Sequence, residues 1–113
     1  MILIKTKASL HRWFIEGRIC GIDFSGVVER VPQGVDCGFK EGDEVYGEMP
    51  PFVGSFAEHV LAYSDFIALK PTNISHTAAA ALPLTGLTVM QAFDDVGLQH
   101  GHRVCIIGAS GGT

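Results

Sequence analysis

The stretch that decides the fold is Arg103-Val-Cys-Ile-Ile-Gly-Ala-Ser-Gly-Gly-Thr113. Its apolar run, residues 104–107, is bounded by turn signals, which is typical of a strand buried on both faces. In α/β nucleotide-binding domains, a strand entering a glycine-rich turn brings a phosphate onto the next helix N-terminus. That helix would follow Thr113, so we expect this sequence to hold only the strand and the turn of such a phosphate-binding unit. The turn itself consists of Gly108, Ala109, Ser110, Gly111 and Gly112.

Taken alone, the glycine-rich turn is a weak signal, because a plain strand-to-helix turn uses the same residues. It is not a P-loop, since it has no Gly-Lys-Ser/Thr. The residues before it favour phosphate binding, because a helix ended by Gly97 leads into the apolar run.

Two helices are predicted after Asn73, where the spacing of apolar residues changes. Ser75 is placed to cap a helix over residues 78–82, which Pro83 ends or offsets. The second helix carries apolar residues at steps of three, which are Leu84, Leu87, Met90, Phe93 and Val96. The uncharged stretch 71–93 contains too many polar residues for a membrane span, so it predicts buried helices in a soluble protein.

Before residue 70, short strand patterns alternate with Gly and Pro turns. The irregular segment 10–17 is predicted to be a loop. This spacing indicates a small barrel or a twisted antiparallel sheet, so we divide the chain into a β-rich domain at 1–72 and an α/β domain beginning at 73–113. Strands are predicted over residues 2–8, 21–31, 44–46, 54–62 and 66–70.

The composition excludes several classes of partner. The 113 residues carry a net charge of −4 without any Lys/Arg cluster, which disfavours nucleic acid and anionic membranes. Cys20, Cys37 and Cys105 fall in no metal-binding spacing and are odd in number. A disulfide framework or a structural zinc site is therefore disfavoured, and a reducing, cytoplasmic location is expected.

No catalytic set can be assembled from proximity in sequence, so the catalytic residues stay unassigned. His100 and His102 flank a turn without further ligands, which favours exposed histidines over a metal site. His59 is expected on the sheet surface, and residues 94–95 on a solvated helix face. Asp23, between two glycines, is expected to stabilise a bend rather than act as a general base.

Five ordered segments together resemble one family, the medium-chain dehydrogenase/reductases, and within it the zinc-free quinone oxidoreductase-like (zeta-crystallin-like) branch. The similarity runs from about Gly21 to the end and is weaker at 2–9. The segments are Gly21-Ile-Asp-Phe-Ser-Gly-Val-Val, Phe39-Lys-Glu-Gly-Asp-Glu-Val-Tyr-Gly, Gly54-Ser-Phe-Ala-Glu-His-Val, Ala78-Ala-Ala-Ala-Leu-Pro-Leu-Thr-Gly-Leu-Thr88 and Val104-Cys-Ile-Ile-Gly-Ala-Ser-Gly-Gly.

The resemblance implies a partial GroES-like β-barrel at 1–72, then the first helix and strand of a Rossmann domain, with NADPH between the two domains. Thr88 would lie near the nicotinamide, and Gly108 to Gly112 would form the pyrophosphate loop. The implied reaction is hydride transfer to a small-molecule quinone or α,β-unsaturated carbonyl. Full-length members would form homodimers.

Departures from the family pattern carry further expectations. Ile22 and Asp23 follow Gly21 where the zinc branch has His-Glu, so no catalytic metal is expected. His11 and Phe14 stand where the family has Asn and Asp. We therefore expect an inactive fragment, clipped at both ends. The alternative is a truncated, non-catalytic GroES-like module that binds another protein through open sheet edges.

Overall fold

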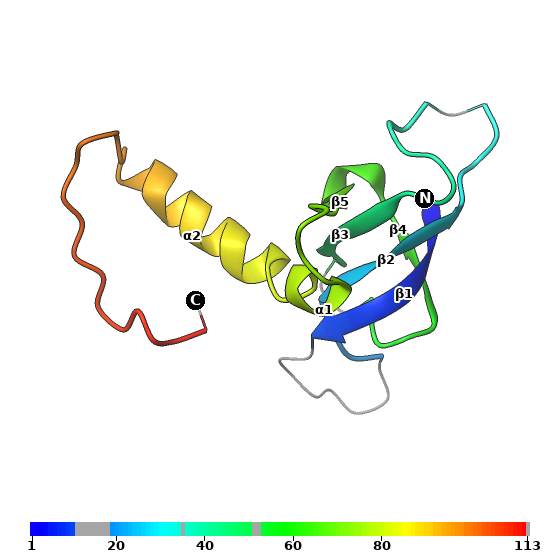
Figure 1. Ribbon diagram of the computed structural model, residues 1–113, viewed down its shortest axis with the longest axis horizontal. Helices are drawn as coiled ribbons and strands as arrows, with labels where there is room; N and C mark the ends of the chain where they lie inside the picture. Colours follow the sequence, from blue (N-terminus) through cyan, green and yellow to red (C-terminus); the bar gives the residue numbers. More distant parts are fainter. Residues whose placement is uncertain (11–18, 35, 51–52, 113) are drawn as a thin grey trace.

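The computed structural model describes residues 1–10, 19–34, 36–50 and 53–112, which form one antiparallel sheet and two α-helices (Figure 1). The strands lie in the order β4-β1-β2-β3-β5, and every neighbouring pair is antiparallel. A short 3₁₀ turn, η1 (Ser64–Phe66), precedes the last strand. The other elements are β1 (Ile2–Leu10), β2 (Asp23–Arg30), β3 (Glu44–Glu48), β4 (His59–Ala62), β5 (Ile67–Leu69), α1 (His76–Ala79) and α2 (Pro83–Asp95).

The predicted β-rich part is confirmed as this twisted sheet, although each strand differs in its bounds from the prediction. The predicted strand 54–62 is shorter, because only its last four residues form β4. The predicted loop at 10–17 lies outside the described residues, except that Leu10 ends β1.

The core lies on one face of the sheet, where alternate residues of neighbouring strands meet. Phe24 of β2 is fully buried opposite Gly47 of β3. A Cβ on Gly47 would lie 2.2 Å from the Phe66 carbonyl oxygen, so only glycine allows β5 to approach here. The buried cluster comprises Ile2, Ile4, Phe24, Val28, Val45, Met49, Val60, Ala62 and Ile67.

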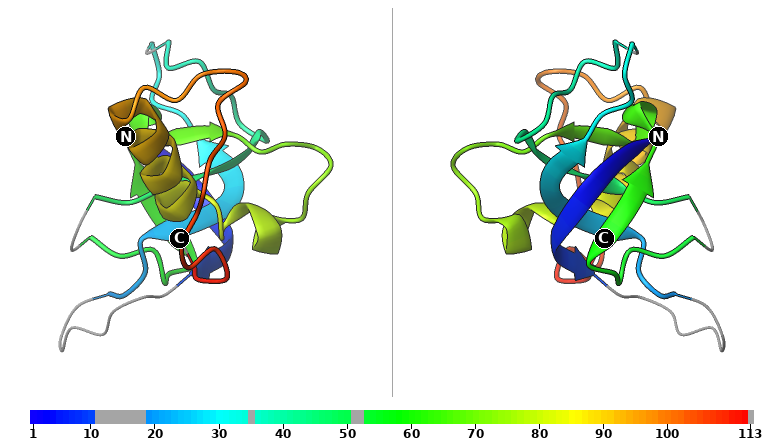
Figure 2. Two further views of the ribbon diagram at one scale, coloured as in Figure 1. Left: turned by 90° about the vertical axis from the view of Figure 1, so that its left-hand side faces the viewer. Right: turned by 90° about the vertical axis from the view of Figure 1, so that its right-hand side faces the viewer.

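The opposite face of β2 is also buried at the start of the strand, where the two helices pack against it. Asp23 and Ser25 alternate with the core residues along the strand and are 3% and 0% exposed. Figure 2 shows the curved sheet from both ends, with α2 seen nearly along its axis.

The start of the first helix and the end of the second lie at the predicted signals, but the boundary between the two helices differs from the prediction. Ser75 caps α1 as predicted, and its Oγ accepts from the Ala78 N–H at 3.2 Å. However, α1 covers 76–79 rather than 78–82, and Pro83 opens α2 at the first helical turn. Gly97 ends α2 with φ +60°, and the Leu98 N–H bonds to the Phe93 carbonyl at 2.9 Å, as in a Schellman motif.

Two predictions for the C-terminal part are wrong. Residues 104–107 form no strand and are exposed, because no strand among the described residues pairs with them. The helices of 71–93 are not buried as a whole, since Pro83 is the one buried residue of α2. Figure 1 shows α2 extending away from the sheet, with the chain after it turning back separately. The radius of gyration of 15.6 Å exceeds the value of about 13 Å for a compact chain of this length.

Within the described ranges, no helix is both long and apolar enough to cross a membrane.

Candidate functional site

Asp23, the first residue of β2, is the point where three parts of the chain meet. Its backbone carbonyl accepts hydrogen bonds from the Ser9 hydroxyl at 3.0 Å and the Ser55 hydroxyl at 2.9 Å. The two serine oxygens are themselves 2.6 Å apart. The two serine hydroxyls have one proton each, and three short contacts join them to each other and to the Asp23 carbonyl. Both protons are therefore donated within this group. The serine pair therefore joins β1, β2 and the 53–58 segment, and it has no proton left to donate to a ligand.

The side chain of Asp23 caps helix α2. Its Oδ1 accepts from the Leu84 N–H at 3.0 Å, whereas Leu82, at the N-cap position, makes no side-chain cap. Burial raises the pKa of Asp23, the hydrogen bond from Leu84 opposes this, and the nearby charge of Glu48 adds to the rise. The predicted bend-stabilising role is replaced by a long-range helix cap, because the carboxylate points to α2 rather than to its own turn.

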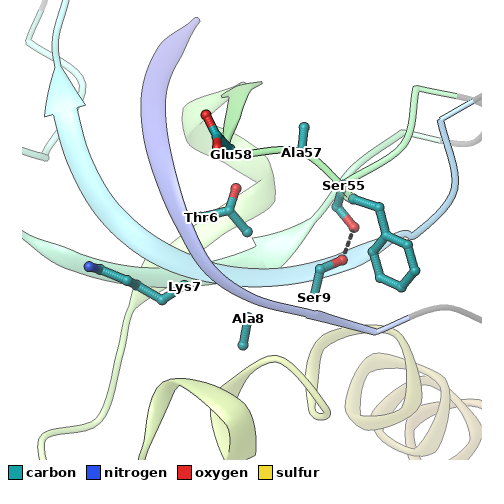
Figure 3. A pocket seen from close by; sticks show the side chains of 8 residues that line it. Thr6, Lys7, Ala8, Ser9, Ser55, Ala57 and Glu58 are labelled. Carbon is teal, nitrogen blue, oxygen red and sulfur yellow. Dashed lines mark hydrogen bonds between the residues drawn. The ribbon is translucent and has the colours of Figure 1, made fainter.

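A shallow hollow of about 570 Å³ lies beside the serine pair (Figure 3). Figure 3 shows the Lys7 ammonium directed away from the two serines. The Thr6 Oγ1 is buried and has no hydrogen-bond partner in the described chain. The charged residues among those that line the hollow are Lys7 and Glu58. It is lined by Thr6, Lys7, Ala8 and Ser9 of β1, and by Ser55, Phe56, Ala57 and Glu58.

The predicted cofactor residues lie apart from this cluster. Thr88 is exposed on α2, and its hydroxyl donates to the Leu84 carbonyl at 2.7 Å. The glycine-rich turn is exposed from Gly108 to Gly112, and the Gly111 N–H bonds back to the Gly108 carbonyl at 2.9 Å. Among the hydrogen bonds described, none joins Thr88 to this turn. Their shared role with a cofactor stays a prediction.

A second polar cluster lies on the buried outer face of β2. Ser25 Oγ is 2.7 Å from His76 Nδ1, and His76 Nε2 is 3.3 Å from Glu44 Oε1. Lys70 is 8% exposed, and its Nζ lies 3.1 Å from Glu44 Oε2. The sequence reasoning missed this cluster, because its members lie far apart in sequence and no motif links them.

The remaining candidates for chemistry lie on the surface. His59 faces solvent from β4, with its Nε2 2.8 Å from Glu29, which confirms the predicted surface position. His100 and His102 are exposed, as expected for turn residues. In the part of the chain that the structure describes, no three His, Cys, Asp or Glu side chains gather as a metal ion would require.

Sequence comparison places the chain beside known reductases. It is 39% identical over 100 residues to the 2-methylene-furan-3-one reductase of Solanum lycopersicum, covering 82% of this chain and 26% of that protein. It is 40% identical over 104 residues to the mitochondrial NAD(P)H oxidoreductase RTN4IP1 of Bos taurus, covering 82% and 25%. The chain thus spans about a quarter of the length of these relatives. No protein-family model matches it.

The fold agrees with a solved structure, the quinone oxidoreductase from Coxiella burnetii. The TM-score is 0.72 at 30% identity, over 88% of this chain and 37% of that one. The chain belongs to the medium-chain dehydrogenase/reductase superfamily. As a medium-chain dehydrogenase/reductase, it shows an antiparallel sheet and two helices that are consistent with a partial GroES-like domain.

Proposed function

We propose that this chain forms the substrate-side part of an NADPH-dependent reductase of quinones or α,β-unsaturated carbonyls. The observation that carries the proposal is its 39–40% identity to two named reductases over 82% of its length. The cofactor would supply hydride to an electron-poor carbon of a small-molecule substrate, while the protein positions and polarises that substrate. We also propose that the reaction needs no zinc, since Ile22 replaces a histidine ligand of the zinc branch.

The proposed division is a partial GroES-like domain at 1–72 and the start of a Rossmann domain at 73–113. The glycine-rich turn fits a pyrophosphate in one respect, because a Cβ at Gly108 or Gly112 would meet nothing within 4 Å and the backbone stays approachable. Thr88 would contact the nicotinamide end. We propose that the 113 residues alone bind NADPH weakly, because the turn is exposed and the described residues after α2 form no helix.

We propose a cytoplasmic location, and the mitochondrial name of the bovine relative makes the mitochondrion the alternative to test. A homodimer is proposed for the full-length enzyme.

A chimaera tests the proposed reaction directly. The matching quarter of the tomato reductase is replaced by this chain, and NADPH oxidation is followed with an enone and with a quinone. We expect measurable turnover, and a matched chimaera carrying Gly108→Val should lose it, because φ is +76° there. A folded chimaera that binds NADPH but reduces neither substrate would contradict the proposed reaction. For the isolated chain, fluorescence titration should show no micromolar NADPH binding.

A second candidate is a non-catalytic module that binds another protein. The sheet order leaves β4 and β5 at its edges, and each exposes a leucine, Leu61 at 51% and Leu69 at 58%. Cooperative unfolding of the isolated chain together with a defined partner would favour this function. Aggregation of the isolated chain would favour the reductase fragment.

A further inference from the structure

A groove of about 560 Å³ lies between helix α2 and the strands β3 and β5. Helix α2 contributes the apolar side chains of Leu82, Leu87 and Met90 to its lining. The sheet side contributes two aromatic rings, Tyr46 of β3 and Phe66 of η1. The groove shares no lining residue with the hollow beside the serine pair. Its volume lies within the range of about 300–1,000 Å³ that is typical of small-molecule sites.

The apolar side chains of the groove are only partly covered by the chain itself. Leu82, Leu87 and Met90 are 45%, 57% and 58% exposed, and Phe66 is 41% exposed. Gly86 leaves further open space on the helix side, because a Cβ there would meet no atom within 4 Å. Apolar surface is therefore available for a ligand to bury.

The charged side chains of the groove are acidic. Glu48 and Asp65 line it, and none of the described residues that line it is Lys, Arg or His. The ion pairs of the described basic side chains go to Glu29 and Glu44 instead. Burial raises the pKa of Asp23, which pairs with Glu48 in the strand register, and the charge of Glu48 adds to the rise. The negative charge of the groove is thus not neutralised by a cation of the described chain.

These charges decide between the possible occupants of the groove. A ligand with phosphate groups, such as the proposed NADPH, would meet two carboxylates and no basic group. A second copy that packed this face on itself would bring Glu48 and Asp65 against the carboxylates of the other copy. A cation would be attracted by both carboxylates, and the rings of Tyr46 and Phe66 attract an ammonium group over their faces.

We propose that this groove binds a small organic cation, in which an apolar or aromatic body carries an ammonium group. The body would lie against Leu87, Met90 and Phe66, and the ammonium group would face Glu48 and Asp65. The inference goes beyond the proposed reductase activity and does not depend on it.

The test is an NMR titration of the ¹⁵N-labelled chain with three probes of similar size. These are the cation 2-phenylethylammonium, the neutral 2-phenylethanol and the anion 3-phenylpropionate. We expect the cation to shift the amide signals of Gly47, Gly86 and Leu87, while that of Ala8, in the separate hollow, stays in place. The cation should bind about tenfold more tightly than the alcohol, and added salt should reduce this difference. The anion should not bind measurably.

Two kinds of variant separate the charge of the groove from its shape. Glu48→Gln combined with Asp65→Asn removes the charge and should lower the affinity for the cation to that for the alcohol. Gly86→Leu adds side-chain volume on the groove side of α2 and should abolish binding of both probes, while favouring the helix. Ala92→Leu is the matched control, because Ala92 is exposed on α2 and does not line the groove, and it should leave binding unchanged.

Equal affinity of the wild-type chain for the cation and the alcohol would overturn the proposal, and so would tighter binding of the anion. If the signals of the groove shifted with protein concentration rather than with the probe, the occupant would be a second copy, which also contradicts the proposal. The comparison of the three probes on the wild-type chain decides the matter if the variants do not fold.

Discussion

The sheet and the segment from α2 onward differ in how much of each is buried. The five strands share one buried cluster, and residues from β1 to β5 contribute to it. From Leu84 to Gly112, by contrast, no residue is buried. Leu87, Met90 and Ile107 are 57%, 58% and 96% exposed. The strands therefore stabilise one another within the chain, whereas α2 depends on its two caps and on the residues around Pro83.

Truncation of core side chains should show the largest difference between the two regions. Phe24→Ala removes a fully buried ring and should lower the free energy of unfolding by about 3–5 kcal/mol. Leu87→Ala, on the exposed face of α2, should change it by less than about 0.5 kcal/mol. Urea denaturation followed by far-UV circular dichroism measures both. Similar losses for the two variants would show that α2 is packed as tightly as the sheet.

A smaller effect is expected at Asp23, which links the two regions. Asp23→Ala leaves the Leu84 N–H without its partner and should destabilise the chain by about 1–2 kcal/mol. Asp23→Asn keeps an acceptor and removes a buried charge, so it should be at least as stable as wild type at neutral pH. The cap requires a hydrogen-bond acceptor at position 23. If Asp23→Asn lost as much stability as Asp23→Ala, the proposed cap would be contradicted.

The pH dependence of the Asp23 variants follows from the raised pKa of that carboxyl. The folded chain takes up this proton at a higher pH than the unfolded chain does. Between the ordinary carboxyl value and the raised one, stability contributed by Asp23 therefore falls as pH rises. Asp23→Asn should remove this slope from a plot of unfolding free energy against pH. If the slope were unchanged in this variant, the pH dependence would come from groups other than Asp23.

The sequence predicted the elements that depend on neighbouring residues. Alternation indicated β1, a valine-rich run after two glycines indicated β2, Ser75 indicated the start of α1, and Gly97 indicated the end of α2. These signals act within a few residues, so one sequence is enough to find them.

The contacts that assemble the site act over much longer separations. Asp23 caps a helix 61 residues away, and Ser25 meets a histidine 51 residues away. Such pairs depend on which strands become neighbours, which the local pattern does not determine. The prediction of a strand at residues 104–107 is wrong for the same reason, because an apolar run forms a strand only where a partner strand is present.

Amide hydrogen exchange followed by NMR tests most directly whether the stable structure ends with α2. We expect slow exchange in β1, β2 and β3, moderate protection through the Leu98 N–H that closes α2, and nearly free exchange at residues 104–112. Protection at residues 104–107 equal to that of β2 would contradict the account, because it would require a buried strand in the C-terminal segment.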